Sequence, residues 1–164
     1  AIAAQYLLEK ELVKKILIID LDVHQGNGTA EIFQKEDRVF TFSMHGKKNY
    51  PFKKEQSDLD IALEDKTNDK KYIEILEEAL PKLLRSVKPD FIFYLSGVDV
   101  LESDRLGRLG VSIKGCEARD QMVLKYCHDK DIPVQCSMGG GYSKDIKLII
   151  EAHANTYRVA QKIY

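Results

Sequence analysis

The chain has 164 residues, of which 44% are hydrophobic and 31% charged, and its formal net charge is -1. This size suits one globular domain with a hydrophobic core, and the balanced charge argues against direct binding to nucleic acid or to an anionic membrane surface. No apolar run reaches the roughly 18 residues of a membrane-spanning helix and no secretory signal opens the chain, so we expect a cytoplasmic protein.

Helices and short apolar strands are predicted to alternate along the chain. Helical periodicity indicates helices at residues 2–14, 28–36, 69–86, 114–129 and 144–162. Apolar runs typical of buried strands occupy residues 15–20, 39–43, 91–96 and 134–138. The helix at 69–86 is expected to kink or break at Pro81, and a polar loop is expected at 44–68. This alternation predicts an α/β fold in which a parallel sheet carries helices on both faces.

Polar residues follow directly after all four predicted strands. These segments are Asp20 to Asn27, Ser43 to His45, Gly97 to Asp99, and Gly139 to Tyr142. In open parallel sheets, ligands bind at the carboxyl ends of the strands. We therefore expect the functional site at this edge of the sheet.

One imidazole and two carboxylates are the candidate metal ligands. Asp22 and His24 are two residues apart, so in extended backbone their side chains point to the same side. Asp99 closes a buried strand, where an unpaired carboxylate would be costly, and is the best candidate for a third ligand. Three protein ligands suit a catalytic zinc ion, and iron(II) tolerates the same donors. An alternative is that Asp22 and His24 are turn or helix-cap residues.

Three segments together resemble the histone deacetylase family, which includes bacterial acetoin-utilization and acetylpolyamine amidohydrolase relatives. They are residues 20–29 (DLDVHQGNGT), 96–107 (SGVDVLESDRLG) and 139–142 (GGGY). The first looks like the family's zinc motif, and its Gln-Gly-Asn form together with the second segment looks closest to the class IV branch. The resemblance runs over essentially the whole chain and implies a three-layer arginase/deacetylase-like fold.

The resemblance implies a zinc-dependent deacetylase that hydrolyses an N-acetyl-lysine or N-acyl-lysine type of amide. Asp22, His24 and Asp99 would bind zinc, and Tyr142 would donate a hydrogen bond to the oxyanion formed when zinc-bound water attacks the amide. Asp20 matches the carboxylate that orients a catalytic histidine, and Asn27 matches the partner of the second histidine of that pair.

Two further sites follow from the same resemblance. A structural potassium ion would bind oxygens of Asp20, Asp22, His24, Ser43 and Met44. Substrate-binding positions along the acyl-lysine tunnel would be Tyr50, Leu106 and Gly140. The expected partner is an acetylated lysine-type substrate, either a protein or a small amine, whereas the acyl length and the oligomeric state stay open.

The family's catalytic His-His pair, normally in a Gly-x-His-His segment before the zinc motif, does not occur in these 164 residues. We therefore expect residues 1–164 to be the C-terminal portion of a histone deacetylase-like domain, with the N-terminal part of the fold missing. Such a chain would hold the metal site and the oxyanion tyrosine and have little amidase activity by itself. The alternative is a relative that binds metal or acyl-lysine without hydrolysing it.

A binuclear ureohydrolase-like enzyme is a second alternative. Those enzymes share the broad fold, carry Asp-x-His-x-Asp and use two manganese ions. Here Gly26 occupies the third position of that pattern and has no side chain to bind a second metal. The sequence therefore favours a single metal ion.

Overall fold

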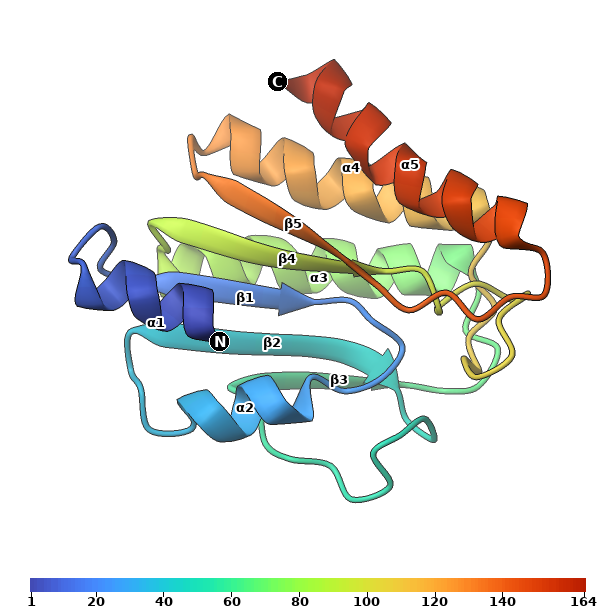
Figure 1. Cartoon of the computed structure of the whole chain (residues 1–164), viewed down its shortest axis with the longest axis horizontal. Coiled ribbons are helices and arrows are strands. Elements are labelled where there is room, and N and C mark those ends of the chain that lie inside the picture. Colours follow the sequence, from blue (N-terminus) through green and yellow to red (C-terminus); the bar gives the residue numbers. More distant parts are fainter.

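A computed structural model describes all 164 residues. Its sheet contains five parallel strands in the order β3-β2-β1-β4-β5 (Figure 1). The strands are β1 (Ile16–Asp20), β2 (Val39–Gly46), β3 (Leu59–Leu63), β4 (Phe91–Gly97) and β5 (Val134–Gly139). The central strand β1 places Asp20 opposite Ser43 of β2 and opposite Leu95 of β4.

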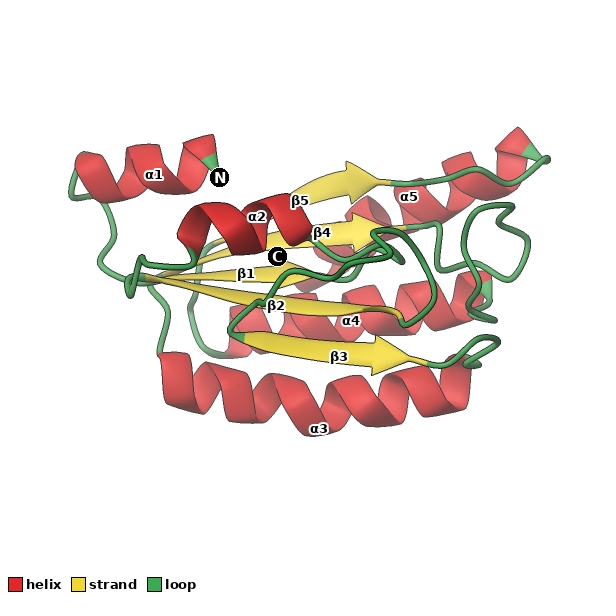
Figure 2. Ribbon diagram, turned by 90° about the horizontal axis from the view of Figure 1, so that it is seen from below, coloured by secondary structure: helices red, strands yellow, loops and turns green.

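Helices cover both faces of this sheet, which confirms the predicted three layers. They are α1 (Ile2–Glu9), α2 (Asn27–Phe33), α3 (Asp69–Val87), α4 (Ile113–Asp129) and α5 (Ile146–Ile163). Helices α1 and α2 lie on one face, and α3 and α4 lie on the other (Figure 2). No helix combines the length and the apolar character needed to cross a membrane.

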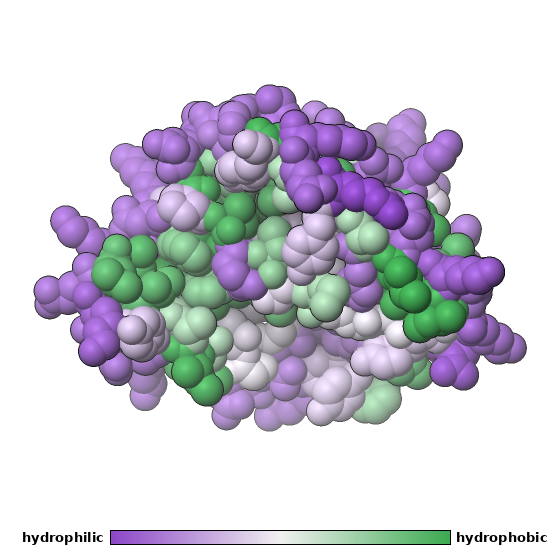
Figure 3. Space-filling model, turned by 45° about the horizontal axis from the view of Figure 1, so that its top comes forward, coloured by the Kyte–Doolittle hydropathy of each residue, from purple (hydrophilic) through white to green (hydrophobic).

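Alternating residues of the strands supply two hydrophobic cores. On the α3 and α4 side, Leu17 and Ile19 belong to a cluster of 25 buried residues. On the α1 and α2 side, Ile16 and Ile18 belong to a cluster of 6, because strand side chains alternate between the faces. The smaller core leaves neighbouring apolar side chains such as Phe93 only partly buried. Figure 3 shows apolar residues gathered across one face of the molecule between polar margins.

The predicted polar loop at 44–68 is wrong in one part, because it contains strand β3. Its residues 59–61 are exposed or only partly buried, as expected of a short strand at the sheet edge. Its sequence LDIAL therefore lacks the continuous apolar character of a strand buried on both faces. The edge position explains why the apolar pattern did not reveal it.

Two helices differ from the predicted pattern. Helix α1 ends at Glu9 rather than at residue 14, and Glu11 then adopts a left-handed φ of 54°. Helix α3 runs unbroken through Pro81 from its cap at Asn68, whose side chain accepts the Lys71 N–H. A proline within a helix costs about 3 kcal/mol. Burial of Leu80, Leu83 and other apolar side chains of α3 on the sheet offsets that cost.

Candidate metal centre

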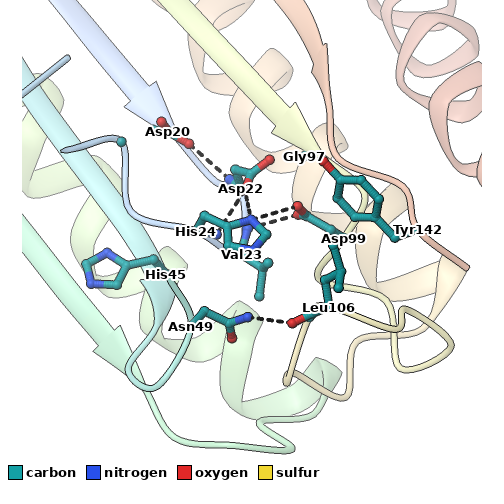
Figure 4. Close-up of polar contacts among 12 residues, drawn as sticks. Asp20, Asp22, Val23, His24, His45, Asn49, Gly97, Asp99, Leu106 and Tyr142 are labelled. Carbon is teal, nitrogen blue, oxygen red and sulfur yellow. Dashed lines mark hydrogen bonds and ion pairs between the residues drawn. The ribbon is translucent and has the colours of Figure 1, made fainter. Parts of the chain in front are cut away.

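The candidate metal ligands lie just beyond the carboxyl ends of β1 and β4, which are neighbours in the sheet. Asp22 and His24 follow β1, and Asp99 follows the end of β4 at Gly97. Because the two strands pair in parallel, these segments leave the sheet side by side. Figure 4 shows the three side chains pointing toward one another. The structure therefore brings together the three residues singled out from the sequence.

The spacing of the three side chains fits one metal ion. Nδ1 of His24 is 3.0 Å from Oδ1 of Asp22 and 3.1 Å from Oδ2 of Asp99. One ligand atom from each residue lies within 4.8 Å of the other two. Two ligands bound tetrahedrally to zinc at about 2.0–2.1 Å are about 3.3 Å apart. Asp99 is buried, whereas the side chains of Asp22 and His24 are 19% and 26% exposed, so solvent reaches one side of the cluster.

The charges at the cluster also suit a cation. Hydrogen bonds to Asp22 and Asp99 raise the pKa of His24 to about 10. Burial raises the pKa of Asp99 and raises that of the adjacent Asp20 to about 7. A proton on His24 thus offsets part of the carboxylate charge, and a divalent cation bound to the imidazole nitrogen would take that proton's place.

Backbone N–H groups orient the carboxylates. The N–H of Val23 donates to Oδ1 of Asp99 at 2.9 Å, which leaves Oδ2 facing His24. The N–H of His24 donates to Oδ1 of Asp22 at 2.9 Å, and the N–H of Asp22 donates to Oδ1 of Asp20 at 3.1 Å. Such outer-shell hydrogen bonds hold ligands in place and tune their affinity for a metal.

Gly140 packs directly against one of these ligands. Its φ is +63°, and a Cβ at this position would overlap Cγ and Oδ2 of Asp99. Any other residue would therefore be strained and would displace the carboxylate. We predicted Gly140 as a substrate-binding residue, and its backbone lies against a candidate metal ligand.

Tyr142 lies on the loop after β5, and 42% of its surface is exposed. Its ring lies beside Asp99 on the β5 side of the cluster (Figure 4). The loop after β4 holds the tyrosine backbone from both sides. The Tyr142 N–H donates to Oδ2 of Asp104 at 2.6 Å, and its carbonyl accepts from Nε of Arg105 at 2.8 Å.

The residues expected around a potassium ion lie on β1, on β2 and on the segment between β1 and α2. Ser43 is opposite Asp20 in the sheet, and its Oγ accepts the Gly26 N–H at 3.4 Å. Met44 is fully buried in β2. Asn27 is the first residue of α2, where its N–H donates to the Gln25 carbonyl at 2.8 Å.

The two predicted tunnel residues are exposed, with Tyr50 at 62% and Leu106 at 55%. They lie on separate loops that Asn49 joins, since its Nδ2 donates to the Leu106 carbonyl at 2.8 Å (Figure 4). This hydrogen bond links the loop after β2 to the loop after β4. Asn49 was not singled out from the sequence.

Two more positioning side chains escaped the sequence prediction. Gln25 is buried. Its Nε2 donates to the Glu55 carbonyl at 2.7 Å, and its Oε1 accepts the Glu55 N–H at 2.9 Å. Asp104 accepts the N–H groups of Leu106 and Gly107, both at 2.8 Å. The Asp-x-x-Gly spacing was the available signal for Asp104, because aspartate often accepts N–H groups two or three residues ahead in turns. Gln25 carries no comparable signal.

Comparison with known proteins identifies relatives of the chain. The family model described as a histone deacetylase domain matches residues 1–157. An uncharacterized protein of Picosynechococcus sp. is 45% identical over 164 residues, which are 100% of this chain and 55% of that protein. Histone deacetylase 2 of Arabidopsis thaliana is 33% identical over 141 residues, 84% of this chain and 36% of that protein. The chain thus spans about half or less of the length of these relatives.

Solved structures show the same fold. The crystal structure of an acetylpolyamine aminohydrolase from Burkholderia pseudomallei has a TM-score of 0.81 at 23% identity, covering 99% of this chain and 48% of that chain. The crystal structure of the HDA15 HD domain has a TM-score of 0.77 at 24% identity, covering 96% and 48%. At this identity the matches support the fold, which is the arginase/deacetylase-like α/β fold predicted from the sequence.

Proposed function

The chain belongs to the histone deacetylase family, and from this premise we propose that Asp22, His24 and Asp99 bind one zinc ion of a deacetylase site. Members of the family are deacetylases and related amidohydrolases and generally depend on zinc, so the chain is assigned to deacetylase-type hydrolases. Iron(II) suits the same donors.

The convergence of one imidazole and two carboxylates at the ends of adjacent strands carries the proposal. The donor set has the composition and spacing of a catalytic zinc site. A single ion is favoured over a pair, because Gly26 lies where a ureohydrolase-like site would have a further carboxylate. A Cβ at Gly26 would already overlap Oδ2 of Asp20, so this position has no room for one.

The bound metal would polarise the acyl carbonyl and supply hydroxide near neutral pH. The hydroxyl of Tyr142 would donate a hydrogen bond to the oxygen that becomes negative, and this stabilises the tetrahedral intermediate. Asp20 and Asn27 would orient the two catalytic histidines of a complete site. The 164 residues contain no adjacent histidine pair, so proton transfer by such a pair lies outside this chain.

The remaining roles are proposed from their positions around the cluster. Tyr50 and Leu106, on loops joined by Asn49, would flank the acyl chain of the substrate, with Gly140 behind Asp99. Asp20, Asp22, His24, Ser43 and Met44 would supply oxygens to a structural potassium ion. The substrate class is an acetylated or acylated lysine-type amine, in a protein or in a small molecule. Residues 1–164 would form the C-terminal portion of the domain.

Metal stoichiometry tests the proposal. We expect one zinc or iron ion per purified chain by elemental analysis and none in Asp99→Ala. Gly28→Ala is a suitable control, because a Cβ at this position meets nothing within 4 Å. Two ions per chain would favour a ureohydrolase-like site instead. Stoichiometric zinc in Asp99→Ala would show that Asp99 is not the third ligand.

A second candidate function is a catalytically inactive relative that binds metal or acyl-lysine, favoured by the absence of a histidine pair in these residues. Both functions predict metal uptake and little turnover by residues 1–164 alone, so they differ in the turnover of a longer chain that contains a histidine pair. We expect the metal-loaded chain to cleave a fluorogenic acetyl-lysine peptide little or not at all by itself. Robust turnover would show that another group in this chain supplies the base.

A further inference from the structure

A buried ion pair lies behind the metal cluster, on the α4 side of the sheet. Arg119 and Asp120 of α4 are both completely buried. Nε of Arg119 donates to Oδ1 of Asp120 at 2.9 Å. Nη1 of the same guanidinium donates to the carbonyl of Gly97 at 2.6 Å and to the carbonyl of Leu21 at 3.3 Å.

These two carbonyls belong to the strand ends that carry the metal ligands. Leu21 immediately precedes Asp22, and Gly97 lies two residues before Asp99. The paired segment of β1 and β4 ends at Asp20 and Leu95. A single guanidinium nitrogen therefore bridges the two chain segments just beyond the point where the pairing of β1 with β4 ends and the ligand-bearing segments begin.

The other side of the ion pair is anchored to two further elements. Oδ1 of Asp120 accepts the hydroxyl of Tyr94 in β4 at 2.5 Å, and Oδ2 accepts the hydroxyl of Thr156 in α5 at 2.6 Å. Nε of Arg119 and the Tyr94 hydroxyl share Oδ1, and this contact fixes the plane of the guanidinium, whereas the Thr156 hydroxyl joins only Oδ2 to α5. The direction of Nη1 toward both carbonyls is thereby set.

Fold stability alone is a weak reason for this arrangement. Well-packed apolar residues commonly replace buried ion pairs without loss of stability. The rigid fork of a guanidinium instead offers several donors in fixed directions, which the single flexible ammonium of lysine does not. Arg119 uses this fork to hold two backbone carbonyls and one carboxylate at once.

We infer that Arg119 is a positioning residue for the metal centre. Its guanidinium holds the ends of β1 and β4 at the separation that Asp22 and Asp99 need to share one ion. The inference rests on the proposed metal-binding function. It assigns Arg119 no contact with metal or substrate. Its effect passes through the backbone of Leu21 and Gly97.

Metal affinity and metal geometry test this role in the full chain. Arg119→Lys and Arg119→Met are compared with Thr156→Val, which removes a hydrogen bond to Asp120 but leaves both carbonyl contacts of Arg119 in place. Zinc affinity is measured by competition with a chromophoric chelator, and coordination by the visible absorption of bound cobalt(II). Thermal unfolding of each variant without metal identifies the variants that fold.

We expect both Arg119 variants to bind zinc about 10-fold or more weakly, the scale of outer-shell effects, and to change the cobalt(II) spectrum. Thr156→Val should keep the wild-type affinity and spectrum even if it unfolds at a lower temperature. If a folded Arg119 variant kept the wild-type zinc affinity and cobalt(II) spectrum, the inference about Arg119 would be wrong, and the proposed function would stand. Failure of the wild-type chain to bind zinc or cobalt would overturn the proposed function itself.

The wild-type protein provides a test that needs no variant to fold. The buried guanidinium of Arg119 should give a resolved NMR signal from its Nε–H. Zinc loading should shift this signal and slow the exchange of its Nη protons, because the ion fixes the strand ends that they bridge. An Arg119 signal unchanged by one equivalent of bound zinc would overturn the inference.

Discussion

The carboxylate of Asp104 accepts the backbone N–H of Tyr142 at 2.6 Å, across 38 residues of sequence. Its other oxygen accepts the N–H groups of Leu106 and Gly107 within its own loop, both at 2.8 Å. One side chain thus links the proposed oxyanion donor to a proposed tunnel residue. The loops after β4 and β5 are held together by this carboxylate and by Arg105.

Replacing Asp104 by alanine should loosen both loops at once. Each lost hydrogen bond to a carboxylate contributes about 1.5–3 kcal/mol, so local opening becomes easier. We expect the amides of Leu106, Gly107 and Tyr142 to exchange with solvent at least about 10-fold faster, as measured by NMR hydrogen exchange. In the control Asn68→Ala, which removes the α3 cap, faster exchange should stay at the start of α3. Unchanged Tyr142 exchange in Asp104→Ala would refute the link.

Gly140→Ala should impair metal binding through Asp99. The added Cβ overlaps the Asp99 carboxylate, and the φ of +63° is unfavourable for alanine. We expect the zinc affinity to fall about 10-fold or more, measured by chelator competition. Gly28→Ala is the matched control, since its Cβ meets nothing within 4 Å and it lies in α2, where alanine favours the helix. Equal zinc affinity in the two variants would contradict the close packing of Gly140.

Gln25→Ala should release the loop between β2 and β3. The buried Gln25 amide bonds the backbone of Glu55 in both directions and the side chain of Asp60. Each lost hydrogen bond contributes about 0.5–1.5 kcal/mol, because Glu55 is only half-buried and Asp60 is exposed. We expect faster trypsin cleavage after Lys53 and Lys54 in native conditions, followed by mass spectrometry. The exposed Gln56→Ala should cleave at the wild-type rate, and the same rate for Gln25→Ala would exclude this anchoring role.

Most of the fold was predictable because apolar patterning reports burial. The inner strands β1, β2 and β4 carry apolar runs and were predicted from them, and β5, at the other edge, was predicted from VQCSM after Pro133. Strand β3 was missed, since the edge position exposes its Asp60 side chain and breaks the apolar run. At Pro81 the sequence suggested a kink or a break, whereas α3 is continuous there. Local propensity disfavours proline within a helix, but burial of one face of α3 keeps that helix intact.

The sequence revealed candidate ligands more readily than their supports. Asp22 and His24 were found from a spacing of two residues, and Asp99 from its place after a buried strand. Arg119 was not found, because its partners Leu21 and Gly97 offer backbone carbonyls, which leave no mark on a sequence. Long-range contacts to backbone, such as that from Asn49 to Leu106, escape any pattern of residue types for the same reason.

The titration of Asp20 should make the metal-free chain less stable as pH rises toward neutrality. Burial raises its pKa in the fold from 3.8 to about 7, so between these values the folded chain keeps a proton that the unfolded chain has lost. The free energy of unfolding therefore falls by as much as about 1.4 kcal/mol per pH unit in this window. This contribution is fully present below the unfolded pKa and is lost as pH rises through about 7.

Urea unfolding at pH 4 to 7, with a chelator and without potassium, measures this dependence. Asp20→Asn should flatten the curve, because an amide at this position does not titrate. The exposed Asp37→Asn should keep the wild-type slope, since it removes a carboxyl from the surface. Adding potassium should flatten the wild-type curve too if the ion binds beside Asp20, because a cation favours the charged carboxylate. A slope unchanged by Asp20→Asn would assign the dependence to other groups and remove the argument for a cation at this carboxylate.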